Sequence, residues 1–200
     1  MPTGQLGPVR RPRARGLRAA QATLMRKALL LLGTLDDQDI DWLIDAGHRR
    51  EVADGTRLVQ EGTTIDALYV LLDGMLSVTV EETGGREVAQ LRSGEIVGEI
   101  SFVDPRPPGA SVTAVGDATV LAIDRDVLVD RLDQDAAFGA RFYRALAVFL
   151  ADRLRGTTVR LGYFDTADVP ENDDLDLEML SQITKAGARF DFMLRRLRGN

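Results

Sequence analysis

Between His48 and Arg125 the apolar residues recur at every second position, in short runs separated by turn sequences that contain glycine. The runs cover residues 56–60, 67–72, 76–80, 87–91, 111–115 and 119–123, and the turns between them include Asp54-Gly55, Asp73-Gly74 and Ser93-Gly94. Short strands at this spacing are typical of an antiparallel barrel or jelly roll, because a parallel sheet requires a helix between successive strands. We therefore expect a mainly β container fold.

Helical patterns flank this region on both sides. An Ala- and Leu-rich segment, residues 17–32, predicts a helix that ends at Gly33, and a second short helix is expected to begin at Asp36 or Asp37. After Arg125 an apolar stripe at helical spacing predicts one long helix, which includes Phe138, Phe142, Leu146, Phe149, Leu150 and Leu154. A last helix has the stripe Leu180, Ile183, Gly187, Phe190, Leu194 and Leu197, where Gly187 would let another backbone approach closely.

The composition along the chain predicts five parts. Residues 1–16 form a flexible basic arm, 17–46 the N-terminal helices, 47–160 the β domain with its long C-terminal helix, 161–174 an acidic linker and 175–200 an extra C-terminal helix. The last helix cannot be stable alone, since most helical stability comes from packing an amphipathic face. We expect it to dock on its own chain or on a second subunit.

Composition excludes several kinds of chemistry. The 200 residues contain no cysteine and one histidine, which excludes disulfides, thiolate zinc sites and the multi-histidine ligand cluster of a metal cupin. Residues 1–30 carry seven basic side chains and no acid, so the rest of the chain is strongly acidic and nucleic-acid binding is not expected. No apolar run approaches the roughly 20 residues of a membrane span. The sequence thus predicts a cytoplasmic protein that is not an enzyme and needs no cofactor.

Residues 94–114 contain the pattern that points to a ligand. The Gly98-Glu99 pair lies between a strand and a short apolar turn, where backbone N–H groups converge and favour an anion such as phosphate. The carboxylate of Glu99 could accept hydrogen bonds from a sugar hydroxyl. The small residues Gly109 and Ala110 would let a ligand approach the returning strand.

With these residues the chain resembles the cyclic nucleotide-binding domain family, the β-roll of catabolite-activator-type regulators, cyclic-nucleotide-dependent kinases and gated channels. The likeness covers residues 35–157 and rests on residues 68–74, on Leu91, Gly94 and 98–100, and on 110–114. The resemblance implies that the backbone of Gly98 and Ile100 meets the cyclic phosphate of cyclic AMP or cyclic GMP. It also implies that Glu99 binds the ribose 2′-hydroxyl and that Ala110 and Ser111 close the pocket.

One position departs from the family pattern. The family's phosphate-binding arginine lies two residues before the Ala-Ser-Val run, and here that position is Pro108, with Arg106 two residues earlier. A charge-assisted arginine–phosphate bond contributes about 1.5–3 kcal/mol, so its loss would weaken binding about tenfold to a hundredfold. Either Arg106 reaches the phosphate from a differently shaped loop, or the pocket binds a modified ligand or none.

Three functions remain open. The first is a regulatory module, a homodimer that binds a cyclic nucleotide and signals to a partner protein in trans. The second is a scaffolding subunit whose roll is empty and whose terminal helices recruit another protein. The third, a transcription regulator, would need a helix-turn-helix domain, and the segment after Arg160 is too short to supply one. We therefore expect a stand-alone member of the family.

Overall fold

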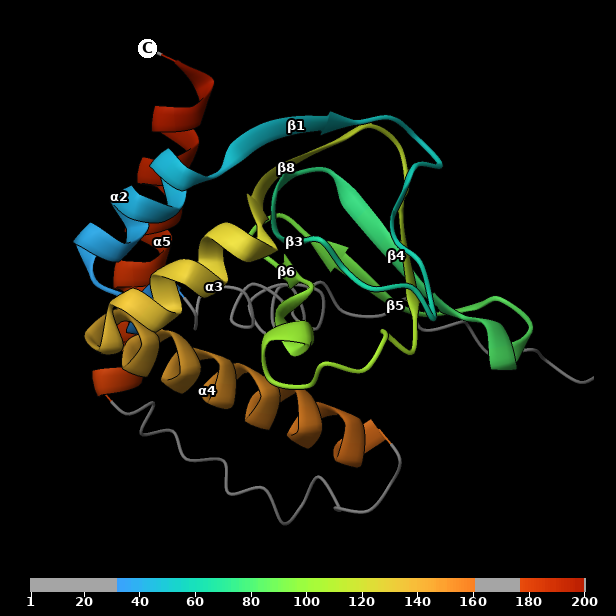
Figure 1. Cartoon of the computed structure of the whole chain (residues 1–200). Helices are drawn as coiled ribbons and strands as arrows, with labels where there is room; N and C mark the ends of the chain where they lie inside the picture. The colour runs from blue at the N-terminus through green and yellow to red at the C-terminus, as the bar shows by residue number, and fades with distance from the viewer. Residues whose placement is uncertain (1–31, 161–176, 200) are drawn as a thin grey trace, which may run out of the picture.

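In the computed structural model, which describes residues 32–160 and 177–199, an antiparallel β-roll has helices packed against one of its faces (Figure 1). The strands are β1 His48–Val52, β2 Arg57–Val59, β3 Ala67–Asp73, β4 Met75–Val80, β5 Arg86–Arg92, β6 Ile96–Val97, β7 Ser111–Ala114 and β8 Ala118–Asp124. They form two four-stranded antiparallel sheets, in the orders β1-β8-β3-β6 and β2-β7-β4-β5. The helices are α2 Asp37–Ala46, α3 Arg125–Gln134, α4 Ala136–Arg160 and α5 Leu177–Arg198, with 3-10 turns η1 Glu81–Thr83 and η2 Glu99–Phe102.

The β-roll and its flanking helices confirm the expected fold class. The predicted helix over 17–32 lies outside the described residues except for Leu32, and the helical backbone there continues through Gly33 to Thr34. The predicted basic arm and acidic linker also lie outside the described residues. The long helix predicted from the stripe between Phe138 and Leu154 is confirmed as α4, and a separate helix, α3, precedes it with a break at Asp135.

Strand β3 explains why the molecule has two apolar cores. All of its residues from Ala67 to Leu72 are buried, since each face of the strand meets a different layer. Tyr69 and Leu71 face the interior of the roll, between the two sheets, whereas Leu68 and Val70 face the helices. Alternate residues of β3 therefore point to opposite faces of the sheet. Both sets are apolar, because the strand is covered on both faces.

Helix α2 begins as the sequence predicts, with Asp36 as its N-cap. The side chain of Asp36 accepts a hydrogen bond from the Asp39 backbone N–H at 2.9 Å, and the Asp39 carboxylate accepts one from the Asp36 N–H at 2.9 Å. This reciprocal pair is a capping box. Asp39 also accepts two hydrogen bonds from Arg141 of α4, at 2.6 and 2.7 Å, so the start of α2 is fixed to the long helix.

Helix α5 docks on its own chain, beside α2 (Figure 1). Ala186 and Met193 are fully buried, although neither belongs to the predicted stripe. Arg189 donates to Asp37 at 2.8 Å and to the Leu32 carbonyl at 2.9 Å, and these bonds fix the helix direction. The close approach expected at Gly187 is wrong for this chain, because a Cβ there would meet no atom within 4 Å. Among the described residues no helix combines the length and apolar character that crossing a bilayer requires.

Candidate ligand-binding site

The β-roll contains a cavity of about 510 Å³. Its wall is formed by apolar residues of both sheets and by the segment that joins β6 to β7, which includes η2. Apart from residues 98–101, that segment contributes Asp104, Arg106, Pro107, Pro108, Gly109 and Ala110. Cavities of about 300–1,000 Å³ are the usual size for small-molecule sites, so the volume suits one ligand of nucleotide size.

Gly98 shapes the entrance to η2. Its φ is +92°, a left-handed conformation that favours glycine, and a Cβ there would lie 2.7 Å from the carbonyl oxygen of Ala67. The hydroxyl of Ser101 donates to the Gly98 carbonyl at 2.7 Å and closes the turn. The glycine that the sequence singled out is therefore required by the backbone, whether or not a ligand is bound.

Glu99 is the buried carboxylate of the cavity wall, with 2% of its surface exposed. It stands in the first turn of η2, directly after Gly98. A second acid, Glu95, is buried nearby in the chain at 7% exposure and accepts a hydrogen bond from the Arg92 backbone N–H at 2.6 Å. The sequence interpretation missed Glu95, whose bond closes the turn between β5 and β6.

Arg106 and Asp104 both line the cavity and pair with each other. The Nε atom of Arg106 donates to Asp104 Oδ2 at 2.8 Å, and Nη2 donates to the same carboxylate. This hydrogen bond lowers the pKa of Asp104 below its ordinary value. The Arg106 side chain is 83% exposed, and its charged end is engaged by Asp104. The sequence interpretation singled out Arg106 and missed its partner.

Pro108 occupies the position that the resemblance gives to arginine. Its ring lines the cavity, and its carbonyl accepts a hydrogen bond from the Gly62 backbone N–H at 2.9 Å. This bond joins the end of the β6–β7 segment to the β2–β3 turn. Among the described residues that line the cavity, the charged side chains are Glu99, Asp104 and Arg106, so the wall carries more negative than positive charge.

The remaining predicted residues lie at the end of the same segment. Ile100, Gly109 and Ala110 line the cavity, and a Cβ at Gly109 would meet no atom within 4 Å, which leaves room for a ligand. Ser111 is the first residue of β7 and lies just beyond the lining. Its hydroxyl accepts a hydrogen bond from the Glu61 backbone N–H at 3.0 Å.

Two side chains connect the cavity wall to the helices, and neither was among the predicted site residues. Arg125, the first residue of α3, donates through Nη1 to the Ser101 carbonyl at 2.9 Å and to the Ser101 hydroxyl at 3.1 Å. Its guanidinium lies 4.9 Å from the ring centre of Phe102, and that ring meets Phe142 of α4 edge-on at 5.9 Å. A displacement of η2 would therefore change the contacts that η2 makes with both α3 and α4.

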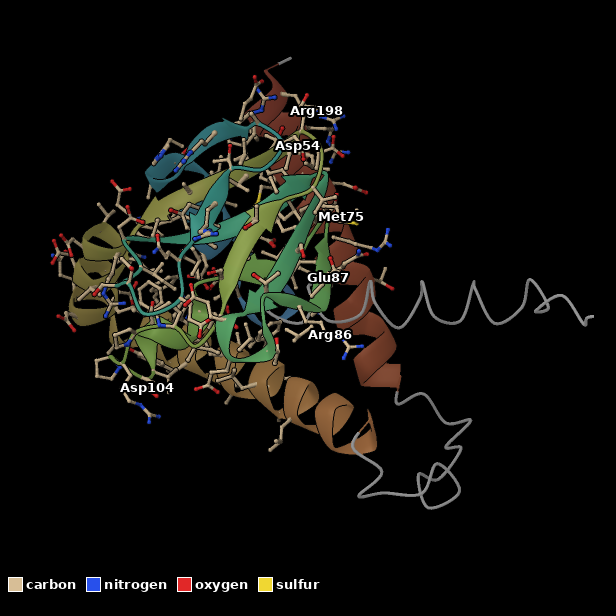
Figure 2. All side chains as sticks on the ribbon, turned by 90° about the vertical axis from the view of Figure 1, so that its right-hand side faces the viewer. Asp54, Met75, Arg86, Glu87, Asp104 and Arg198 are labelled. Carbon is tan, nitrogen blue, oxygen red and sulfur yellow. The ribbon has the colours of Figure 1, made fainter. Side chains whose placement is uncertain are left out.

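Figure 2 places Asp104 at the lower edge of the roll, at the opposite end of the molecule from Arg198 at the tip of α5. In the part of the chain that the structure describes, no group of three or more His, Asp or Glu side chains could hold a metal ion. The polar groups among the described lining residues are backbone amides, carboxylates, a hydroxyl and the Arg106 guanidinium, which suit hydrogen bonds to a ligand.

Comparisons with known proteins identify one domain family. The sequence profile described as the cyclic nucleotide-binding domain matches residues 49–135. NTE family proteins of Mycobacterium bovis and Mycobacterium tuberculosis are 26% identical over 151 residues, which is 76% of this chain and 25% of theirs. The Cyclic AMP receptor protein of Thermus thermophilus is 31% identical over 132 residues, which is 64% of this chain and 58% of that protein.

Among solved structures, the N-terminal domain of a transcriptional regulator from Streptomyces coelicolor has a TM-score of 0.53 and 31% identity. The match covers 64% of this chain and 90% of that domain. The chain spans a quarter of the length of the mycobacterial relatives and just over half of the Thermus protein. The similarity therefore concerns the domain that this chain contains and not the whole length of the curated relatives.

Proposed function

Because this chain belongs to the cyclic nucleotide-binding domain family, we propose that it is a regulatory module that binds cyclic AMP or cyclic GMP in its β-roll. The observation that carries the proposal is the cavity of about 510 Å³, whose wall brings Gly98, Glu99, Ile100 and Ala110 together. These residues come from both ends of the β6–β7 segment. A ligand that spans the segment would order it as one unit.

The residue roles follow from the chemistry of the wall. Glu99 accepts a hydrogen bond from the ribose 2′-hydroxyl, because a carboxylate oxygen is a hydrogen-bond acceptor and the site is otherwise mostly apolar. The backbone of Gly98 and Ile100 meets the cyclic phosphate at the start of η2. Gly109 and Ala110 leave space beside the ligand, and Ser111 fixes the strand that follows.

The affinity is expected to be modest. Pro108 supplies no charge, and Arg106 is paired with Asp104, so no arginine can reach the phosphate unless that ion pair is broken. A hydrogen bond to a charged group contributes about 1.5–3 kcal/mol, which corresponds to a tenfold to hundredfold weaker complex.

Binding is transmitted to the helices and then to a partner protein. The route runs from η2 through Arg125 and Phe102 to α3 and α4. On α4, the exposed apolar side chains of Tyr143, Val148 and Leu154 support a homodimer or a contact with that partner. The role proposed is regulatory rather than catalytic.

The experiment that tests the proposal is thermal unfolding with and without cyclic AMP and cyclic GMP. A ligand at 100 times its Kd stabilises the folded state by about 2.7 kcal/mol and raises the Tm. We expect a rise at millimolar nucleotide for the natural chain. The variant Pro108→Arg combined with Arg106→Ala should show the same rise at a nucleotide concentration tenfold or more lower.

Glu99→Ala provides the negative control, since it should fold and lose the nucleotide response. The proposal would be overturned if neither the natural chain nor the Pro108→Arg variant responded to either nucleotide. That result would favour the second candidate, a scaffolding subunit with an empty roll. The observation in favour of that candidate is that the described residues lining the cavity carry a net negative charge, which opposes a phosphate.

A further inference from the structure

Arg106 binds the Asp104 carboxylate in a geometry that a ligand phosphate could also adopt. Arg106 uses one edge of its guanidinium, Nε and Nη2, and both atoms donate to Asp104. A phosphate can likewise form a bidentate pair with an arginine guanidinium. The carboxylate of Asp104 therefore occupies the edge that a phosphate would use, and both residues line the cavity.

Backbone hydrogen bonds fix the Asp104 carboxylate but not the Arg106 side chain. The Asp104 N–H donates to the Ile100 carbonyl at 2.8 Å, which places the carboxylate directly after η2. Asp104 Oδ1 also accepts the Arg106 backbone N–H at 3.1 Å. The Arg106 side chain, by contrast, is 83% exposed, and its hydrogen bonds are to Asp104 alone among the described residues.

Exchange of this partner is easy, because exposed ion pairs contribute little to stability and are screened by salt. A phosphate in the cavity would offer Arg106 an acceptor of equal geometry and similar charge. The turn at Asp104 would persist through its backbone bonds when the guanidinium leaves.

We propose that Asp104 competes with the ligand phosphate for Arg106 and so sets how tightly the cavity binds an anion. This inference rests on the proposed function and names a specificity-determining residue for it. In the free protein Asp104 holds Arg106, and in the complex the guanidinium turns to the phosphate. The ion pair between Asp104 and Arg106 has to be broken when the ligand binds, and this cost keeps the affinity low.

Asp104→Asn tests the competition with little change to the loop. The amide oxygen still accepts the Arg106 N–H, while the negative charge is removed. We expect the variant to bind cyclic AMP about two- to fivefold more tightly in calorimetric titration, since an exposed ion pair contributes at most about that factor. Adenosine, which has the ribose and base but no phosphate, should bind both proteins equally.

The double change Asp104→Asn with Arg106→Ala completes the test. If Arg106 is the group released, the double variant should bind cyclic AMP no better than Arg106→Ala alone, so the two effects are not additive. Asp133→Asn is the matched control, since it removes an exposed acid that does not line the cavity, and the affinity should be unchanged.

The outcomes separate this inference from the proposed function. If the natural chain binds cyclic AMP and Asp104→Asn binds it with the same affinity, the competition is refuted and the proposed function stands. A gain that adenosine shares, or that persists in the double variant, also refutes it, because the phosphate or Arg106 would not be involved. If no variant binds a nucleotide, both are overturned.

Discussion

At the scale of single residues, the carboxylate of Asp39 is buried between α2 and α4, with 1% of its side chain exposed. Burial raises the pKa of Asp39, but the hydrogen bonds and charge of Arg141, together with the Asp36 N–H, outweigh it. The pKa therefore lies below its ordinary value. A folded-state pKa below the unfolded value of about 3.9 contributes stability above that pH, and the contribution is lost as the pH falls through the folded value.

We expect Asp39→Asn to lower the free energy of unfolding at pH 7 by about 1–3 kcal/mol, because Arg141 would lose the charge of its buried partner and keep only Asp36, at 3.2 Å. Denaturant titrations from pH 7 to pH 2 should show the difference shrink below about pH 4, where the natural carboxylate is protonated too. Asp37→Asn is the control: that side chain is 87% exposed, and its loss should cost less than about 1 kcal/mol. A difference that stays constant over this range would contradict the assignment.

The residues of the candidate site differ in how far the sequence could predict them. Gly98 and Glu99 were predictable, because a glycine before an acid at the end of a strand indicates a special backbone and a buried acceptor. The pairing of Arg106 with Asp104 was not, since it depends on how a loop rich in proline turns two residues toward each other. Ser111 was placed correctly along the chain, but its side chain faces the Glu61 backbone and lies just outside the lining.

At the scale of elements, Arg125 stands in the first turn of α3, where the helix dipole disfavours a positive charge. Its hydrogen bonds to Ser101 and its contact with Phe102 offset that cost. We expect Arg125→Ala to lower the free energy of unfolding by about 1–2 kcal/mol. Hydrogen exchange of the backbone amides in η2 should also become faster.

Arg86→Ala is the matched control for this prediction. Arg86 is an exposed arginine on β5, and its loss should change stability by no more than about 0.5 kcal/mol. Unchanged exchange in η2 of the Arg125 variant would mean that α3 does not hold the cavity wall. The route proposed for the signal would then have to run through Phe102 and Phe142 alone.

The elements also show where periodicity succeeds and fails. The six strand-like runs were predictable from their alternation and bounding turns, with ends within one or two residues. Strand β6 has two residues, which is too short to show any period. The break before α4 was not predicted, because the apolar stripe that the sequence shows begins only at Phe138. Asp135, which accepts the backbone N–H groups of Ala137 and Phe138, was the signal that could have located it.

At the scale of the whole molecule, α5 completes the core between the helices and the β1-β8-β3-β6 sheet. Met193 is fully buried there, and Phe190, Phe192, Leu194 and Leu197 pack against the same cluster. We expect Met193→Ala to lower the free energy of unfolding by about 2–5 kcal/mol. Lys185→Ala, on an exposed face of α5, should change it by no more than about 0.5 kcal/mol.

A chain that ends at residue 176 should have a lower Tm and an exposed apolar surface that makes it aggregate. Light scattering measures this, and the same measurement on the full chain reports whether its mass is a multiple of 21.9 kDa, as the proposed homodimer requires. If the shortened protein were equally stable, equally soluble and unchanged in its oligomeric state, α5 would be a free recruitment segment rather than part of the core.

The contact between α5 and the start of the described chain has a consequence for synthesis on the ribosome. Arg189 donates to the Leu32 carbonyl, so two segments 157 residues apart must meet before the core is closed. At a translation rate of about 5–20 residues per second, Met193 is made roughly 3–14 s after the last strand of the roll. During that interval the nascent roll exposes the apolar face that α5 will cover. Chains released before residue 177 would keep it exposed, and chaperones and proteases could distinguish them from finished molecules.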